Sequence, residues 1–330
     1  MKILRLLAST VLLATAGTLF ADPYEALDPV TGIYEGSWKT KSGQGDVVSQ
    51  IRPLGDGAYD GFVLLKQGDK TVAVIKVATP KSATPGPLAL AGKSAGNKSD
   101  PLAAGQIDAK INGSHLDGSI GGDLGDGTFS AKKVVKKSRT LGAKPPKGAV
   151  VMDQSKWSNF QWKVNPDGSW QVEKSGLDTT EKLTDFQLHV EFRTPLMATS
   201  QGQARGNSGV YLQSVYEVQV LDSFGLYPLQ INDCGSIYGV KTAAGNACLP
   251  PTQWQTYDIT YHHGDGTAAN PPVITIKHNG QVTIDNAKVP ADKVGKGGGG
   301  GNVNGGFLML QNHGNPVQFR NIWAQPLKNK

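Results

Sequence analysis

Polar side chains recur at short intervals in residues 206–225, GNSGVYLQSVYEVQVLDSFG. In YEVQVL, Glu217 and Gln219 alternate with apolar residues, which is the pattern of a β-strand that buries one face. A strand that only supports the fold needs the apolar half of this pattern. Carboxylates and amides suit a ligand that carries many hydroxyl groups. The polar members of the segment are Asn207, Tyr211, Gln213, Glu217, Gln219 and Asp222.

A second polar face is predicted in HVEFR, where alternation sends His189, Glu191 and Arg193 to one side of a strand. If both segments share a sheet, its polar face combines carboxylates, a guanidinium, amides and an aromatic ring that suits the C–H face of a sugar. The alternative is a solvated outer face on which Glu and Arg pair across strands. The amides favour the ligand-binding interpretation, because Asn and Gln add little β propensity.

The segment LQNHGNPVQFRNIW places Gln311, Asn312 and His313 at the end of a predicted strand. Loops at strand ends often carry catalytic residues on a rigid scaffold. The ordinary pKa of histidine suits His313 to acid or base chemistry, and a structural turn residue is the alternative. Ser208 lies in no nucleophile-elbow motif, so a serine nucleophile is not predicted.

No cofactor or metal site is assigned from the sequence. Asp222, Glu217 and Asn207 can offer oxygen ligands to a bound Ca²⁺, but no spaced loop like an EF-hand is present. Cys234 and Cys248 are the two cysteines, with thirteen residues between them and no pair of histidines at ligand spacing beside them. In an exported chain this favours a disulfide, worth on the order of 3 kcal/mol.

The first 21 residues carry Lys2 and Arg5, then an apolar run and small residues. This is the pattern of a signal peptide cleaved after Ala21, and no later stretch is long and apolar enough for membrane insertion. We therefore expect a secreted or periplasmic protein. Much of the net charge of +6 lies in the basic run 132–147, which is typical of a solvated linker and does not predict nucleic-acid binding.

Short alternating segments, 42 glycines and 19 prolines predict an all-β chain. Residues 22–139 are expected to form a β-rich amino-terminal domain, either a small sandwich or a barrel. Residues 140–148 belong to a Pro- and Gly-containing linker. The many strands of residues 149–330, without helical periodicity between them, predict an antiparallel sandwich.

The second part of the chain resembles the 3-keto-disaccharide hydrolase family over about residues 149–327, and residues 22–140 loosely resemble the β-rich extension of some members. The resemblance implies a concanavalin-like jelly roll that acts on glycosides already oxidised at C3. A 3-keto group acidifies the C2 proton, so a base can start β-elimination of the C1 substituent, with or without hydration, unlike the two-carboxylate glycosidases. The matching stretches are EFRTP, GNSGVYLQ, YEVQVLDS, NDCGSIYGV, WQTYDITY, KHNGQV and LQNHGNPVQFRNIW.

The resemblance also implies a set of site residues. Glu217 and His313 are expected to transfer protons, and Arg193 with Asn207 to hold the keto or enolate oxygen. Asn312 stands where members often carry an acidic residue. A non-catalytic, lectin-like carbohydrate-binding module is the alternative function, because this fold hosts many lectins. The residues expected to bind or orient the oxidised glycoside are Glu191, Asn207, Tyr211, Gln219, Asp222 and Gln311.

Overall fold

The computed structural model describes residues 23–80, 87–94, 103–265, 267–291 and 305–328. The predicted signal peptide lies outside these residues. In the described part, helical structure is confined to two short 3-10 turns, Gln154–Lys156 and Gly202–Ala204. None of its helices is long and apolar enough to cross a membrane. The prediction of an all-β chain is confirmed.

The amino-terminal strands form a closed antiparallel barrel, in which each strand pairs with the next and β8 pairs with β1. Alternation explains the closure: in β6, Ile107, Ala109 and Ile111 are buried while the residues between them are exposed. The sequence left a sandwich and a barrel open, and the structure shows the barrel. Its strands are β1 (Gly32–Thr40), β2 (Gly43–Gly55), β3 (Ala58–Gln67), β4 (Lys70–Ala78), β5 (Leu88–Ser94), β6 (Gly105–Asn112), β7 (His115–Gly122) and β8 (Gly127–Val134).

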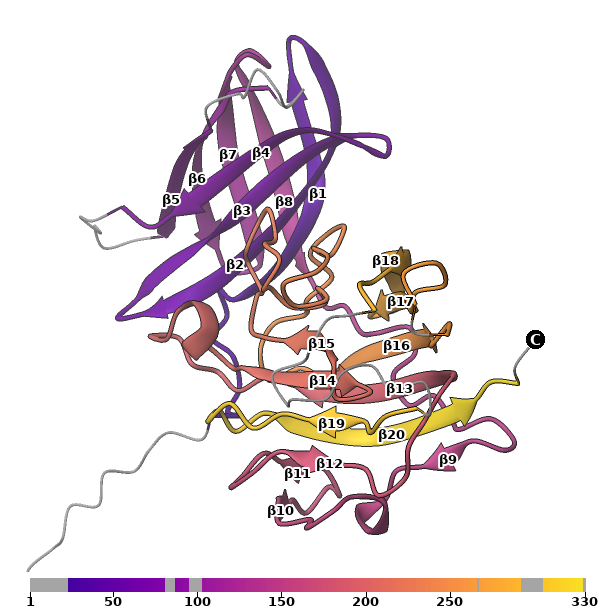
Figure 1. Cartoon of the computed structure of the whole chain (residues 1–330). Helices are drawn as coiled ribbons and strands as arrows, with labels where there is room; N and C mark the ends of the chain where they lie inside the picture. The colour runs from indigo at the N-terminus through magenta and orange to yellow at the C-terminus, as the bar shows by residue number, and fades with distance from the viewer. Residues whose placement is uncertain (1–22, 81–86, 95–102, 266, 292–304, 329–330) are drawn as a thin grey trace, which may run out of the picture.

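Two antiparallel sheets follow the barrel and lie below it in Figure 1. The first, called the large sheet, has the order β10-β11-β20-β13-β16-β17-β18, and β9 also pairs with β20. Its strands are β9 (Val150–Val151), β10 (Lys163–Val164), β11 (Trp170–Gln171), β13 (Phe186–Arg193), β16 (Gln255–His262), β17 (Val273–His278), β18 (Gln281–Lys288) and β20 (Gln318–Pro326).

The second sheet, called the small sheet, has the order β12-β19-β14-β15. Val210 and Val218 of the small sheet share one buried apolar cluster with Val190 and Phe192 of the large sheet, so the two sheets pack as a sandwich. Full burial of such side chains contributes roughly 1.5–3 kcal/mol each. The small-sheet strands are β12 (Leu177–Asp178), β14 (Ser208–Leu212), β15 (Tyr216–Val220) and β19 (Met309–Leu310).

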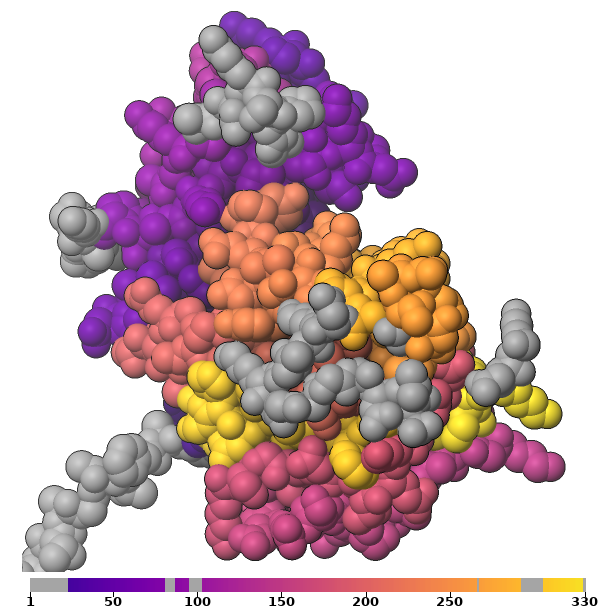
Figure 2. All heavy atoms as spheres, viewed as in Figure 1, coloured from indigo at the N-terminus to yellow at the C-terminus, as the bar shows by residue number. Residues whose placement is uncertain are grey.

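The barrel and the sandwich contact each other through specific hydrogen bonds. Gln50 of β2 accepts a hydrogen bond from the Gly225 amide at 2.9 Å, and Arg205 Nη1 donates to the Pro53 carbonyl at 3.1 Å. Figure 2 shows the orange segments of the sandwich lying directly against the barrel. The linker also docks, since Thr140 Oγ1 donates to Asp258 of β16 at 2.6 Å. The connection between the two halves is therefore fixed at both ends.

Candidate functional site

The outer face of the small sheet carries Tyr211, Glu217 and Gln219. Because Val210, Val218 and Val220 of the same two strands lie in the core, alternation turns these polar side chains away from it. Tyr211 pairs with Glu217 across β14 and β15. A methyl group at Gly209 would lie 2.5 Å from Glu217 Oε1, so a glycine is needed to leave room for this carboxylate.

Glu217 and Tyr211 form a buried acid–phenol pair, with 6% and 2% of their surfaces exposed. Tyr211 Oη donates to Glu217 Oε2 at 2.8 Å, and Gln311 Nε2 donates to Tyr211 Oη at 3.1 Å. Burial and then the charge of Glu217 raise the pKa of Tyr211 far above its ordinary value. The phenol therefore stays protonated and acts as a donor to the Glu217 carboxylate.

An amide cluster continues this face beyond Gln219. Gln219 Nε2 donates to Gln203 Oε1 at 2.9 Å, and Asn207 Nδ2 donates to the same oxygen at 3.0 Å. The side-chain carbonyl oxygens of Asn207, Gln219 and Gln311 are buried and accept no hydrogen bond from the described part of the chain. Buried acceptors are nearly always satisfied, so these three oxygens are available to donors from water or from a ligand.

Gln203 was not foreseen from the sequence. It lies in a 3-10 turn, Gly202–Ala204, with no alternation to mark its direction. Its side chain is nevertheless the acceptor that joins Asn207 to Gln219. A lone polar residue in a glycine-containing loop gives no sequence signal of this function.

The loop after β19 carries His313, which is exposed. Asn312 fixes the turn, because its Oδ1 accepts from the Gly314 amide at 2.7 Å and its Nδ2 donates to the Lys174 carbonyl at 2.8 Å. Asn315 Oδ1 accepts from the Asn207 amide at 2.7 Å, which anchors the loop beside the amide cluster. Asn312 thus has a structural function that an aspartate, lacking the donor, would perform only in part.

Glu191 and Arg193 do not share a face with Glu217, contrary to the sequence expectation. Their strand, β13, belongs to the large sheet, and both side chains point away from the core that contains Val190 and Phe192. Arg193 Nε donates to Gln318 at 2.7 Å, and its guanidinium lies 4.7 Å from the Trp254 ring. Alternation predicted the face of the strand correctly but not the sheet that the strand joins.

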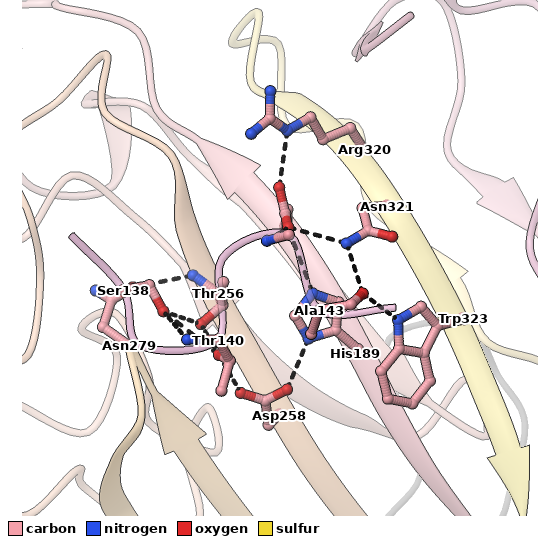
Figure 3. A network of polar contacts seen from close by, with 12 residues as sticks. Ser138, Thr140, Ala143, His189, Thr256, Asp258, Asn279, Arg320, Asn321 and Trp323 are labelled. Atoms are coloured by element: carbon pink, nitrogen blue, oxygen red, sulfur yellow. Dashed lines mark hydrogen bonds and ion pairs between the residues drawn. The ribbon is translucent and has the colours of Figure 1, made fainter. Parts of the chain in front are cut away.

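The outer face of the large sheet holds a polar network around His189 (Figure 3). His189 Nδ1 lies 2.6 Å from Asp258, and its Nε2 lies 3.6 Å from Glu191 Oε1. Glu191 also accepts from Arg320 Nε at 2.7 Å and from the Gly142 amide at 2.5 Å. Burial opposes its charge, but these hydrogen bonds outweigh burial and lower the pKa of Glu191 to about 2. Its contacts are those of a structural charge.

Asp222 is held by a buried ion pair. Its Oδ2 lies 2.7 Å from Arg205 Nε, and each side chain is 1% exposed. Its Oδ1 accepts from the Phe224 amide at 3.3 Å. The carboxylates of Asp222 and Glu217, which were considered for Ca²⁺, therefore already have separate partners in Arg205 and Tyr211. Ca²⁺ binding stays a prediction.

The predicted Cys234–Cys248 disulfide is not formed in this structure, where both cysteines are free and buried. Their sulfur atoms and a ring nitrogen of His278 all lie within 4.8 Å of one another. This is the metal-ligand group that the described residues offer. Burial lowers the pKa of His278 to about 3, so the imidazole is neutral. His278 was not predicted as a ligand, because KHNGQ is typical of a hairpin turn.

The chain is similar to two solved structures from one organism. A crystal structure of a "putative glycosyl hydrolase" from Parabacteroides distasonis ATCC 8503 is 34% identical, covers 55% of this chain and 85% of that chain, and superimposes with a TM-score of 0.49. A second structure with the same description and organism is 18% identical, covers 53% and 91%, and has a TM-score of 0.39. No curated protein matches the chain.

The family model described as "3-keto-alpha-glucoside-1,2-lyase-like domain" matches residues 111–325. The match begins in β6 and extends through the sandwich, so it includes the last barrel strands, the linker and both sheets. The small-sheet face with Glu217 and the loop with His313 lie within it. The chain therefore belongs to the 3-keto-disaccharide hydrolase family.

Proposed function

We propose that the protein is an exported enzyme that cleaves glycosides whose sugar ring is already oxidised to a ketone at C3. Family membership supports a carbohydrate-active protein. The observation that carries the proposal is the Glu217–Tyr211 pair, with its 2.8 Å hydrogen bond, on a buried face that also holds three unsatisfied amide oxygens. We further propose that the sandwich is a concanavalin-like jelly roll whose small sheet binds the substrate.

The reaction starts at the C2–H bond, which the neighbouring ketone makes acidic. The Glu217 carboxylate takes this proton, and the electron pair of the C–H bond moves into an enolate whose negative charge lies on the C3 oxygen. The enolate then expels the C1 substituent, which takes the C1–O electron pair and a proton, and leaves a C1–C2 double bond. Water can add across this bond to complete hydrolysis. A positioned base of this kind accelerates proton transfer by roughly 100- to 10,000-fold.

The polar groups around Glu217 have complementary functions in this scheme. Tyr211 fixes the orientation of the carboxylate through Oε2. The free carbonyl oxygens of Asn207, Gln219 and Gln311 accept hydrogen bonds from sugar hydroxyls. His313, on the loop after β19, donates the proton to the leaving group at the solvent side. Since Arg193 lies on the other sheet, the loop after β19 supplies the donor to the enolate oxygen in this scheme.

Carbohydrate binding without catalysis is the second candidate function. The amide cluster of Asn207, Gln203 and Gln219 favours it, because these side chains bind hydroxyl groups but transfer no protons. The two functions differ in what they require of Glu217. An enzyme needs its charge, whereas a lectin keeps most of its hydrogen bonds when this residue is glutamine.

A pair of substrates that differ only at C3 tests the proposal. The purified full chain is incubated with a 3-keto-glucoside and with the unoxidised glucoside that carries the same leaving group, and free leaving group is measured. We expect release from the keto compound alone. Loss of release in Glu217→Gln, but not in the exposed control Glu181→Gln, assigns the activity to the small-sheet face. Equal cleavage of both compounds would indicate an ordinary glycosidase, and binding without cleavage would indicate a lectin.

A further inference from the structure

Cys234, Cys248 and His278 meet in the buried interior of the sandwich, close to the backbone of Gln219. The two cysteines lie in the long connection between β15 and β16, and His278 is the last residue of β17. They are 1%, 2% and 1% exposed. Two sulfur atoms and one imidazole nitrogen within 4.8 Å of one another are a ligand set for a thiophilic metal ion.

Hydrogen bonds fix the imidazole of His278 in an orientation suited to ligation. Its Nε2 lies 3.0 Å from Gln255 Oε1, an oxygen that also accepts from the Leu249 amide and from Asn279 Nδ2. A carbonyl oxygen has no proton to give, so Nε2 must carry the proton and Nδ1 keeps a free electron pair. Nδ1 faces the loop of Cys234, because a methyl group at Gly235 would lie 3.3 Å from it. Metal-binding histidines are usually oriented by such a bond from their other ring nitrogen.

We propose that Cys234, Cys248 and His278 bind one Zn²⁺ ion. Two thiolates and a neutral imidazole balance the charge of Zn²⁺, and a net charge of zero keeps the desolvation cost of a buried site low. Cu⁺ with the same ligands would leave a buried net charge of −1. Zn–S bonds of about 2.3 Å and Zn–N bonds of about 2.0 Å place tetrahedral ligands roughly 3.5–3.8 Å apart. The three ligand atoms therefore need only a small inward movement, and the two thiols release two protons on binding.

The zinc ion would serve a structural purpose beside the candidate site. Tyr257 Oη lies 3.1 Å from Cys234 Sγ and donates at 2.6 Å to the backbone carbonyl of Gln219. The connection that carries both cysteines also contains Asn232, whose carbonyl accepts from Gln219 Nε2 at 3.3 Å. A zinc ion that joins this connection to β17 would therefore also hold in place the segment to which the Gln219 side chain is hydrogen-bonded. A disulfide would join the two sulfur atoms but would leave the oriented imidazole of His278 without a metal ion to bind.

Metal analysis of the full chain, produced without added reductant, tests this site. We expect one equivalent of zinc, and two thiols that react only after unfolding in the presence of a chelator. Cys248→Ser and His278→Gln should lose the zinc, whereas His262→Gln, a control at an exposed histidine of β16, should keep it. A metal-free protein overturns the proposal, either with a mass lower by two hydrogens, which indicates a disulfide, or with two freely reactive thiols.

Cobalt substitution of the unmutated protein keeps the proposal testable if the variants do not fold. Co²⁺ bound by two thiolates and an imidazole gives intense thiolate-to-metal absorption and the visible bands of a tetrahedral ion. We expect one equivalent of Co²⁺ to produce this spectrum and Zn²⁺ to abolish it. An octahedral or absent spectrum would contradict the site.

Discussion

The two outer faces of the sandwich each bury a glutamate, Glu191 on a central strand of the large sheet and Glu217 on the edge strand of the small sheet, yet they are built differently. On the large sheet, Glu191 is surrounded by Arg320, Asn321, the Gly142 amide and His189. Every one of these partners comes from the protein itself, including the linker that closes the face. A buried carboxylate with this many charged and polar partners maintains a structure, and removing one partner is costly.

On the small sheet, Glu217 has a neutral neighbour in Tyr211, and the amides around it keep free acceptor oxygens. A face with unfilled acceptors suits the binding of a ligand better than a purely structural function. Burial of a carboxylate alone does not distinguish the two cases, whereas the charged partner of Glu191 and the unfilled amide oxygens near Glu217 do.

The largest expected effect is on turnover in Glu217→Gln. We expect roughly a 100-fold or greater loss of kcat on the 3-keto substrate, because glutamine cannot take the C2 proton. Substrate binding and the free energy of unfolding should change little, since the amide keeps the shape and accepts from Tyr211. Steady-state kinetics and urea unfolding check both parts. A large loss of stability with normal turnover of the folded fraction would show that Glu217 has a structural function rather than a catalytic one.

The next prediction concerns His313→Ala, which should lower kcat by roughly 100-fold if the imidazole protonates the leaving group. The exposed side chain makes few contacts, so the melting temperature should not move. Substrates with more acidic leaving groups need less protonation and should recover much of the lost rate. A uniform loss across leaving groups would show that His313 only positions the loop.

A complementary effect on stability is expected in Glu191→Ala. This change leaves Arg320 and the Gly142 amide without their carboxylate, and we expect a loss of about 3 kcal/mol in the free energy of unfolding. The kcat per folded molecule should stay within a few-fold of the unmutated value. Urea unfolding with active-site titration separates the two. Preserved stability with lost turnover would place Glu191 in catalysis after all.

A smaller effect is expected in the pH dependence of stability. Glu191, with its pKa lowered to about 2 from 4.5, stabilises the fold above pH about 4.5, and this contribution is lost as the pH falls toward 2. Burial opposes the charge of His189, but Asp258 and Glu191 raise its pKa above 6.5 overall. Its contribution is complete below pH 6.5 and is lost as the pH rises through the raised pKa.

Stability from this network should therefore be greatest between pH about 4.5 and 6.5, which urea unfolding across the pH range will show. In His189→Gln the decline above this window should disappear, while the acid decline should remain. An unchanged alkaline decline in that variant would assign it to another group.

Alternation in the sequence was sufficient to predict the strands and the inward and outward faces of β14 and β15, because it reflects the two-residue repeat of the backbone. It could not predict that β13 joins the other sheet. That choice depends on pairing with β16 and β20, which lie far along the chain, and no local pattern encodes it. Gln203 and His278 could not be predicted for a related reason. Gln203 lies in a turn and His278 at the end of a hairpin strand, and each meets its partners only in the folded chain.

Hydrolysis in heavy water is the most direct test of the central claim that the Glu217 face removes the C2 proton. When elimination is followed by hydration, the hydrogen at C2 of the released keto sugar comes from the solvent. We expect one deuterium at C2 in the product made by the unmutated protein and by Glu191→Gln, above the exchange seen without enzyme, and a rate of labelled product lower by roughly 100-fold or more in Glu217→Gln. Product that keeps its original C2 hydrogen, or labelling at an undiminished rate in Glu217→Gln, would contradict this mechanism.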